Sequence, residues 1–367
     1  MLRVLTITSS RAEYDLLFPL LDLMRKSNKI NNKIIACGSH VDKRFGSTIN
    51  EIKKDKFTNI YEIDTLKLQT SNSNFDMLNS FNIFFSEFVR FLKNKKIDLI
   101  LLLGDRYEVF SASICAYILN IPIAHISGGD TSLGSKDENF RNSISLMSDL
   151  HFVKVKKHKE KLLSLGINKN KIFVTGSLSN DNYKKNFNKK FFLSKPLILI
   201  TFHSVTNSKK KGDSDIKDLL TSLKKLKNYN LLFTSSNHDA GGKKINSIIK
   251  KFVESSKNSV FIHNLGRDLY YQAMKDCEFM IGNSSSGIIE SMIYKKPAIN
   301  ILPRQLGRYS NKNVINCYNN VNDIDKSIKK ALTKNFKIKC KKFKNYFKNN
   351  YNKPSIIMLK TILKNYG

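Results

Sequence analysis

The chain has 367 residues, of which 41% are hydrophobic and 10% aromatic, and its formal net charge is +33. This length suits two domains of ordinary size, and the apolar content excludes an intrinsically disordered chain. The positive charge invites a nucleic-acid function, but lysine is spread over nearly every polar stretch and no recognised nucleic-acid-binding motif accompanies it. We therefore expect no nucleic-acid partner.

From the apolar pattern we expect neither a targeting signal nor a membrane-spanning helix. Met1 to Thr8 form an apolar run that is too short for a signal peptide and indicates a first strand. No stretch approaches the roughly 18 continuous apolar residues of a membrane helix. The five cysteines are far apart and form no C-x-x-C pair, which is typical of reduced, buried thiols. We expect a cytoplasmic protein with no membrane partner.

Short apolar runs alternate with amphipathic stretches in the first half. The runs indicate buried strands at Arg3–Thr8, Lys33–Cys37, Asp98–Leu103, Pro122–Ile126 and Leu150–Val155. Helix-like segments lie between them, at Leu16–Lys26, Ser86–Lys93 and Tyr107–Leu119. This alternation predicts a parallel sheet with crossover helices.

The pattern pauses over 181–195 and then restarts. The second set of strands is predicted at Leu197–Phe202, Leu231–Thr234, Val260–His263, Phe279–Ile281 and Ala298–Ile301. We therefore expect an α/β protein with two Rossmann-like, doubly wound domains at 1–185 and 186–350, facing a central cleft. A C-terminal helix within 351–367 is expected to pack back on the first domain. Ligands of open parallel sheets bind outside the C-terminal ends of the strands, so polar residues at those ends are the candidates for a site.

The first strand runs into a polar turn that contains Ser9, Ser10, Arg11 and Glu13. Such a strand-to-helix turn suits an anion, because unpaired N–H groups and the helix dipole favour negative charge there. The alternative is a capping box between Ser10 and Glu13, which leaves Arg11 unexplained.

Asp105 follows the aliphatic run Leu101–Leu103 and Gly104. Partial desolvation at the end of a buried strand raises the pKa of a carboxyl group and suits it to acid or base catalysis. The alternative is that Asp105 caps the following helix.

The next strand is followed by Ser127-Gly128-Gly129 and Asp130, and glycine lets a backbone approach a ligand closely. Asp137 and Arg141 then stand at i and i+4 on one helix face, where an ordinary surface ion pair is the alternative. Three carboxylates after successive strands, Asp105, Asp130 and Asp137, make a plausible acid/base group.

The second half offers His203 at a strand end and a turn rich in small residues before a helix. That turn contains Asn283, Ser284, Ser285, Ser286 and Gly287. Its hydroxyl and N–H groups suit a diphosphate, and Glu290, one helical turn later, is placed to accept from ribose hydroxyls. A serine-rich helix cap is the structural alternative.

Taken together and in order, these motifs resemble the UDP-N-acetylglucosamine 2-epimerase family, and most closely its hydrolysing branch, which supplies sialic-acid-type sugar synthesis. The resemblance spans nearly the whole chain. It is carried by Ser10–Tyr14, Gly104–Glu108, Ala124–Asp130, Asp137–Arg141, Val174–Ser177, His203, Asp239–Gly242, Gly282–Glu290 and Arg304–Arg308.

The resemblance implies a glycosyltransferase-B fold and a reaction in which a carboxylate removes the C2 proton while UDP leaves C1, after which water adds to the glycal. It implies Asp105, Asp130 and Asp137 as the acid/base set, without saying which takes the proton. Diphosphate contacts are implied for Arg11, Arg141, His203, Ser284 and Ser285, and a ribose contact for Glu290. No nicotinamide or metal cofactor is implied. The expected partners are a UDP sugar or a GDP sugar and further copies of the chain, in a dimer or tetramer.

The chain departs from the pattern of the branch in places. Ser127-Gly128-Gly129-Asp130 stands where His-Gly-Gly-Glu is usual, and the shorter carboxylate points to a differently substituted sugar. Ser204 stands where a proline is common. Ala12 replaces the proline of the Arg-Pro-Glu motif found in epimerases that return a nucleotide sugar, which indicates hydrolysis.

Two other functions stay open at this stage. A glycosyltransferase of the same fold would bind the nucleotide through the same second-domain residues, but it needs no base for C2 and leaves the three carboxylates unexplained. A basic binding module would explain the charge and none of the motifs.

Overall fold

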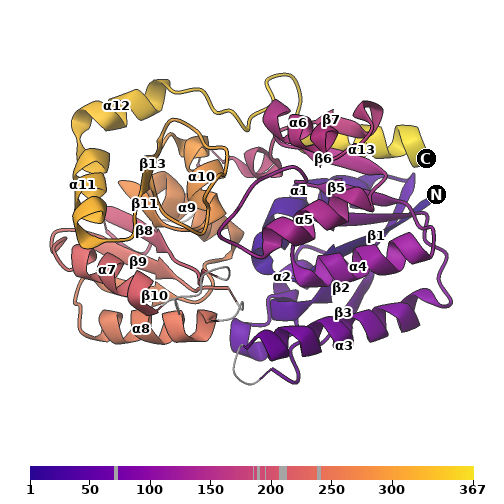
Figure 1. Ribbon diagram of the computed structural model, residues 1–367, viewed down its shortest axis with the longest axis horizontal. Coiled ribbons are helices and arrows are strands. Elements are labelled where there is room, and N and C mark those ends of the chain that lie inside the picture. The colour runs from indigo at the N-terminus through magenta and orange to yellow at the C-terminus, as the bar shows by residue number, and fades with distance from the viewer. Residues whose placement is uncertain (70–72, 185, 188–190, 195, 206–212, 238–240) are drawn as a thin grey trace. The chain divides into compact units, whose positions relative to one another are not determined.

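The computed structural model describes residues 1–69, 73–184, 186–187, 191–194, 196–205, 213–237 and 241–367. The chain forms two compact units, each built around one parallel sheet. The first unit contains Met1–Asp130, Asp137–Asn182 and Phe347–Gly367, and the second contains Thr131–Lys136 and Tyr183–Tyr346. The predicted fold class, α/β with two Rossmann-like sheets, is confirmed (Figure 1).

The sheet of the first unit has the order β3-β2-β1-β4-β5-β6-β7, so the winding direction reverses between β1 and β4. Its strands are β1 (Leu2–Thr8), β2 (Ile30–Cys37), β3 (Ile60–Ile63), β4 (Leu99–Leu103), β5 (Ile123–Ile126), β6 (Leu150–Val153) and β7 (Ile172–Val174). The edge strands β3 and β7 were not predicted, because they are short and partly exposed and make no continuous apolar run.

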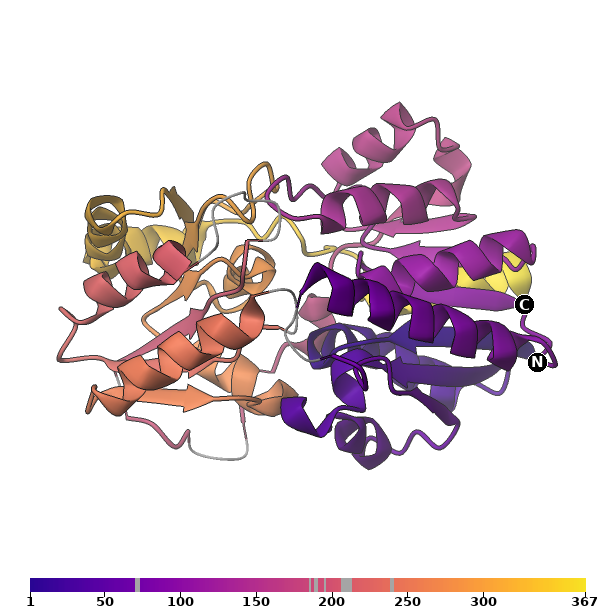
Figure 2. The same cartoon turned by 60° about the horizontal axis from the view of Figure 1, so that its bottom comes forward.

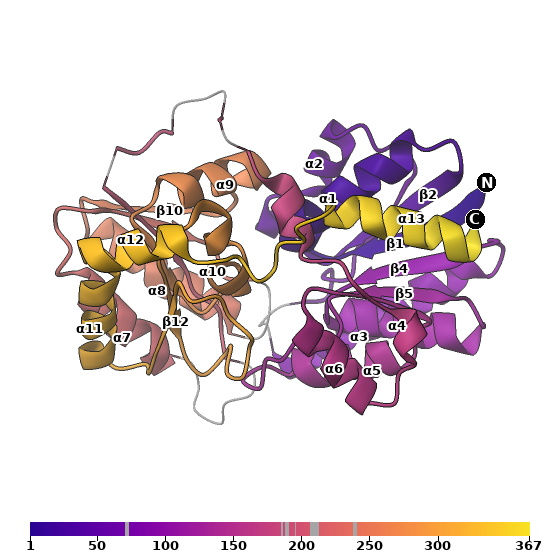
Figure 3. The same cartoon turned by 90° about the horizontal axis from the view of Figure 1, so that it is seen from above.

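Helices cover both faces of this first sheet. They are α1 (Arg11–Lys26), α2 (Ile49–Lys54), α3 (Asn74–Leu92), α4 (Tyr107–Ile118), α5 (Asp137–Leu146), α6 (Lys156–Ser164) and α13 (Pro354–Tyr366). Core residues of α3, α4 and α5 pack on one face, and those of α1, α2 and α13 on the other. Helix α13 lies along α1, with Met358 and Ile362 fully buried in the same core (Figure 3).

The second unit repeats this design with the order β10-β9-β8-β11-β12-β13, reversing between β8 and β11. Its strands are β8 (Leu197–Thr201), β9 (Asn230–Thr234), β10 (Ser259–Ile262), β11 (Phe279–Gly282), β12 (Ala298–Ile301) and β13 (Val314–Cys317). Its helices are α7 (Asp213–Leu223), α8 (Gly242–Glu254), α9 (Gly266–Asp276), α10 (Ser285–Ile289), α11 (Val321–Leu332) and α12 (Lys334–Lys342). Helices α7, α8 and α11 contribute to the core on one face of this sheet, and α9 to the core on the other (Figure 2).

A short segment interrupts the first unit and belongs to the second. Within Thr131–Lys136, the Leu133 N–H donates to the Leu306 carbonyl at 3.0 Å. A Cβ added at Gly134 would lie 2.2 Å from the Pro303 carbonyl oxygen, so this close approach requires glycine. The sequence pattern predicts this segment within the first domain, at 1–185. In the structure it separates Asp130 from Asp137.

Two further expectations concern thiols and membranes. All five cysteines are free and buried, and burial raises the pKa of each thiol. Among the helices in the described ranges, none is long and apolar enough to cross a membrane.

Candidate active site

Several candidate residues lie where each sheet reverses its winding direction. In the first unit, the turns after β1 and β4 bring Ser10, Arg11 and Asp105 to neighbouring strand ends. In the second unit, the turns after β8 and β11 do the same for His203 and the serine-rich segment. Such reversal points are where open α/β sheets bind ligands.

Asp105 is held in the turn between β4 and α4. Gly104 precedes it with φ +83°, a left-handed conformation that favours glycine. The N-cap of α4 is Arg106, so the alternative in which Asp105 caps this helix is wrong. The Asp105 carboxylate instead contacts Nη2 of Arg141, and 22% of its side chain remains exposed.

Arg141 is the centre of a buried charge cluster. Its Nη1 donates to the Asp130 carbonyl at 3.1 Å and to Glu138 Oε2 at 2.8 Å. Burial by itself would lower the pKa of Arg141, but the charges of Asp105, Asp130 and Glu138 raise it above the usual value. The guanidinium is therefore charged. Because only 2% of its side chain is exposed, the surface-pair alternative is wrong.

Asp130 is held by three residues that are not among the site residues predicted from the sequence. It is 1% exposed, with Oδ2 accepting from Lys154 Nζ at 3.1 Å and Oδ1 lying 3.4 Å from His158 Nε2. Lys161 Nζ donates to the Asp130 carbonyl at 2.9 Å and also contacts Glu138. Asp130 is thus a buried, paired carboxylate.

A signal for some of these partners was present in the sequence. Lys154 follows β6 directly, in the same position relative to its strand as the polar residues after β1. His158 and Lys161 stand at i and i+3 on α6, and neighbours at this spacing share a helix face.

Asp137 is the first residue of α5 and is half-buried.

The turn after β1 forms only half of the expected capping box. Ser10 is the N-cap of α1, and its hydroxyl accepts from the Glu13 N–H at 3.4 Å. The Glu13 carboxylate, however, accepts from Ser9 and thereby departs from the expected capping box. Arg11 lies on α1 with Nε 3.9 Å from Asp15 Oδ2.

His125 supports the turn that carries Asp105. Burial lowers the pKa of this histidine to about 3, so the ring is neutral. Its Nε2 lies 2.8 Å from the Gly104 carbonyl, which only accepts, so Nε2 carries the proton. Nδ1 then accepts from the Ser145 hydroxyl at 3.0 Å. His125 therefore fixes the backbone immediately before Asp105.

In the second unit, Asn283 joins the turns after β8 and β11. Its Oδ1 accepts from the His203 N–H at 2.7 Å, and its Nδ2 donates to the His203 carbonyl at 2.8 Å. The His203 ring accepts at Nδ1 from the Asn237 N–H at 3.2 Å. The amide of Asn283, a predicted nucleotide contact, thus holds the main chain of His203 in place.

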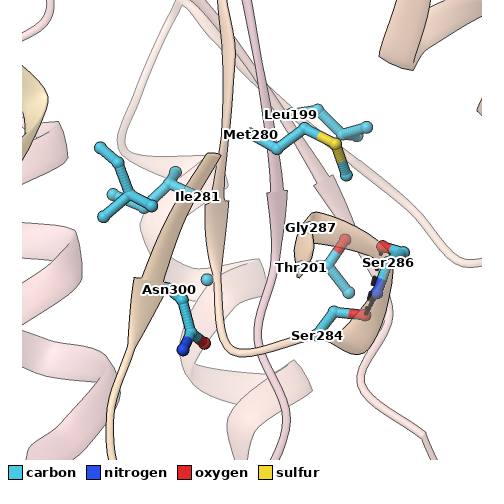
Figure 4. Close-up of a pocket in the computed structure, with 10 residues that line it drawn as sticks. Leu199, Thr201, Met280, Ile281, Ser284, Ser286, Gly287 and Asn300 are labelled. Atoms are coloured by element: carbon cyan, nitrogen blue, oxygen red, sulfur yellow. Dashed lines mark hydrogen bonds between the residues drawn. The ribbon is translucent and has the colours of Figure 1, made fainter. Parts of the chain in front are cut away.

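The serine-rich turn is partly used for its own structure. Ser284 caps α10 and accepts from the Ser286 N–H at 3.4 Å, and the Ser286 hydroxyl bonds the Tyr270 hydroxyl. Ser284, Ser286 and Gly287 line a small pocket with Thr201 and Asn300 (Figure 4).

Ser285, Gly287 and Glu290 are half-buried, at the start, in the middle and at the C-cap of α10. Residues 238–240, which carry part of the Asp239–Gly242 motif, lie outside the described residues.

Comparison with known proteins identifies the fold and then the family. A crystal structure of UDP-GlcNAc 2-epimerase from Neisseria meningitidis bound to UDP-GlcNAc matches with a TM-score of 0.79, over 99% of this chain and 100% of that chain, at 20% identity. This likeness establishes a two-sheet, glycosyltransferase-B-like fold.

The family model described as UDP-N-acetylglucosamine 2-epimerase matches residues 22–358. The chain belongs to this family, as the ordered motifs had predicted.

Two relatives are similar over nearly their whole length. GDP/UDP-N,N'-diacetylbacillosamine 2-epimerase (hydrolyzing) from Campylobacter jejuni is 38% identical over 346 residues, which cover 91% of this chain and 88% of the relative. Polysialic acid biosynthesis protein P7 from Escherichia coli is 32% identical over 374 residues, which cover 99% of this chain and 95% of the relative.

Proposed function

We propose that this protein is a hydrolysing 2-epimerase that converts a UDP-linked 2-acetamido sugar into UDP and the free sugar inverted at C2. The observation that carries the proposal is the group of carboxylates around the buried Arg141, which contacts Asp105 and Glu138 directly and also interacts with the charge of Asp130. The names of the relatives support the same reaction. A glycosyltransferase has no comparable use for this cluster.

The reaction consists of an elimination and a hydration. A carboxylate takes the C2 proton, the electrons of the C2–H bond form the C1=C2 bond, and the C1–O bond breaks with its electrons moving to the diphosphate of UDP. Water then adds at C1 and a proton is delivered to C2 from the opposite face. A C2–H bond is very weakly acidic, so fixed donors must stabilise the leaving diphosphate as its charge develops.

Asp105 and Asp137 are the carboxylates that we propose to exchange protons with the sugar. Asp105 is partly exposed and Asp137 half-buried, whereas Asp130 is paired with Lys154 and enclosed. We assign Asp130 a supporting role, in which it places Lys154 and, through its carbonyl, Arg141. Arg141 is buried and paired with carboxylates. We therefore propose that it positions these carboxylates and does not contact the diphosphate.

We propose that the second unit holds UDP. Ser285 and the N–H groups of the serine-rich turn are the proposed donors to the diphosphate, together with His203. Glu290 is the proposed partner of the ribose hydroxyls. Asn283 sets the position of His203 through its two bonds to the His203 main chain.

The substituents of the sugar are a separate part of the proposal. The Campylobacter jejuni relative is named GDP/UDP-N,N'-diacetylbacillosamine 2-epimerase (hydrolyzing). This name supports a 2,4-diacetamido substrate, and UDP-N-acetylglucosamine is the alternative. The free 2-epimer is the kind of sugar that nonulosonic-acid synthesis of the sialic or legionaminic type consumes.

Proton NMR of the purified protein in heavy water tests the proposal. We expect UDP to appear together with a free 2-epimer deuterated at C2, from UDP-N-acetylglucosamine or from its 2,4-diacetamido analogue. Turnover of the analogue alone would identify the sugar. A folded protein that binds UDP but shows neither product nor C2 exchange with UDP or GDP sugars would contradict the proposal.

A further inference from the structure

Glu13 is a buried carboxylate in the first unit that the proposed reaction does not use. It is 8% exposed and accepts two hydrogen bonds from Ser9, from the N–H at 2.8 Å and from the hydroxyl at 2.9 Å. Ser9 is itself fully buried and lies between β1 and the N-cap of α1. The carboxylate of Glu13 therefore holds the turn that leads into Ser10 and Arg11.

The other oxygen of Glu13 faces the turn after β4. Its Oε1 lies 3.8 Å from Arg106 Nε, and the same nitrogen donates to Glu108 Oε2 at 3.2 Å. One guanidinium thus lies near two carboxylates, and Glu108 is completely buried. Arg106 directly follows Asp105, so any movement of its main chain moves Asp105 as well.

The turn after β2 packs closely against Ser9 and Glu108. A Cβ added at Gly38, after β2, would lie 2.5 Å from the Ser9 carbonyl oxygen and 3.2 Å from Glu108 Oε1. Gly38 has φ +58°, which also favours glycine. The turns after β1, β2 and β4 therefore pack against one another through Ser9, Gly38 and Glu108.

Joining two turns through a buried carboxylate is unfavourable in itself, because ionising a carboxyl group away from water costs free energy. An apolar side chain of similar size has no such cost. Burial raises the pKa of Glu13 to about 7, even though Arg106 and the two Ser9 donors lower it. Such groups concentrate at functional sites. Here the group lies at the reversal point of the sheet, between the two turns that carry Arg11 and Asp105.

We propose that Glu13 is a positioning residue, which joins the turn after β1 to the turn after β4 through Ser9 and Arg106 and so sets the distance between Arg11 and Asp105. Its effect on turnover rests on the proposed function, whereas the joining of the two turns does not. Displacement of a reacting group by about 1 Å is enough to slow an enzyme roughly 100-fold.

The test compares Glu13→Gln with Glu254→Gln, the same chemical change at an exposed position on α8. Hydrogen–deuterium exchange on the full chain without ligand should show faster exchange in Glu13→Gln, in the peptides covering 8–14 and 103–108 together. The turnover number should fall about 100-fold, with a change in KM of less than about threefold. Glu254→Gln should match the parent in both measurements.

The outcomes separate the two proposals. A parent protein that turns over no sugar nucleotide overturns the proposed function, and exchange in the two peptides still decides whether Glu13 joins the turns. Unchanged exchange in either peptide, or a turnover number within about threefold of Glu254→Gln, overturns the role of Glu13. If Glu13→Gln does not fold, Ser9→Ala removes one donor and keeps the N–H, and it should loosen the same two peptides. Its failure to do so overturns the inference.

Discussion

Arg141 is the residue on which the polar groups after β4 and β5 converge. It contacts the Asp105 carboxylate, the Asp130 carbonyl and Glu138, and almost none of its side chain is exposed. A buried guanidinium needs such partners, because an isolated buried charge is strongly destabilising. The cluster that serves the proposed chemistry is thus also a requirement of folding at this edge of the sheet.

Substitution of Asp105 by Asn tests the acid/base role with little change in shape. We expect the turnover number to fall by about 100-fold or more, because an amide neither accepts nor returns a proton at neutral pH. The dissociation constant for UDP, measured by titration calorimetry, should change less than about threefold. Asp218→Asn, on α7 of the second unit, is the control. Full activity of Asp105→Asn would remove Asp105 from the mechanism.

The pH dependence of stability tests the environment of Glu13. Burial raises its pKa from 4.5 to about 7 in the folded protein, with Arg106 lowering it and Glu108 raising it. The folded state therefore binds this proton more tightly than the unfolded state. The resulting stabilisation is present below about pH 4.5 and is lost as pH rises through 7.

Glutamine does not titrate, so Glu13→Gln should not share this loss. The unfolding free energy of Glu13→Gln minus that of the parent should therefore rise between pH 4.5 and 7, by about 3 kcal/mol at most, and stay constant above pH 7. Urea titrations at a series of pH values measure the difference. Glu13 interacts with other titratable groups, which are the buried Cys37 and Glu108 and the Arg106 guanidinium. A difference that does not vary with pH would mean that Glu13 ionises normally.

At the scale of secondary structure, the contact between β8 and β11 places the nucleotide side of the proposed site. Gly282 ends β11 with φ +145°, and a Cβ there would lie 1.9 Å from the Thr201 carbonyl oxygen. The two strand ends meet this closely only with glycine. Asn283 directly follows β11, and His203 is the second residue after β8.

Gly282→Ala should therefore separate β8 from β11 and destabilise the second unit by about 3 kcal/mol or more, since both the space and the backbone conformation exclude a side chain. Gly287→Ala is the matched control, because its Cβ would approach only Ala298, at 4.0 Å. Thermal melting should show a large shift for the first variant and a small one for the second. Equal shifts would contradict this account of the strand ends.

At the scale of the whole chain, neither unit is continuous in sequence. The first is completed by Phe347–Gly367 and the second by Thr131–Lys136, so the chain passes between them four times. The last helix, α13, supplies Met358 and Ile362 to the core beneath α1. The stability of the first unit thus depends on a segment that lies more than 160 residues after the rest of that unit in the sequence.

Ile362→Ala tests this dependence. Removing a fully buried isoleucine side chain should cost about 2–5 kcal/mol, because the surrounding core closes the cavity only in part. Ile338→Ala on α12, where the side chain is 43% exposed, should cost less than about 1 kcal/mol. Guanidinium unfolding measures both. Equal effects would show that α13 adds little to the core.

The sequence by itself determined the class of this fold and most of its central strands. Strands buried on both faces appear as continuous apolar runs, so the positions of β1, β4, β8 and β12 could be predicted from the sequence pattern alone. The prediction of Asp105 and His203 as site residues, shortly after these runs, follows from the rule that such sheets bind ligands at their strand ends. The order of the motifs identified the family.

Only the tertiary structure decided which of these residues meet. Strand order is set by pairing between segments far apart in the chain, so the reversal points between β1 and β4 and between β8 and β11 are invisible in local pattern. Lys154, His158 and Lys161 are ordinary polar residues until β6 and α6 pack beside Asp130. Glu13 looks like half of a capping box, yet the fold turns its carboxylate toward Ser9 and Arg106. Side-chain direction and burial depend on the packed neighbours, and these decide whether a charge near a strand end can reach a substrate or only position another residue.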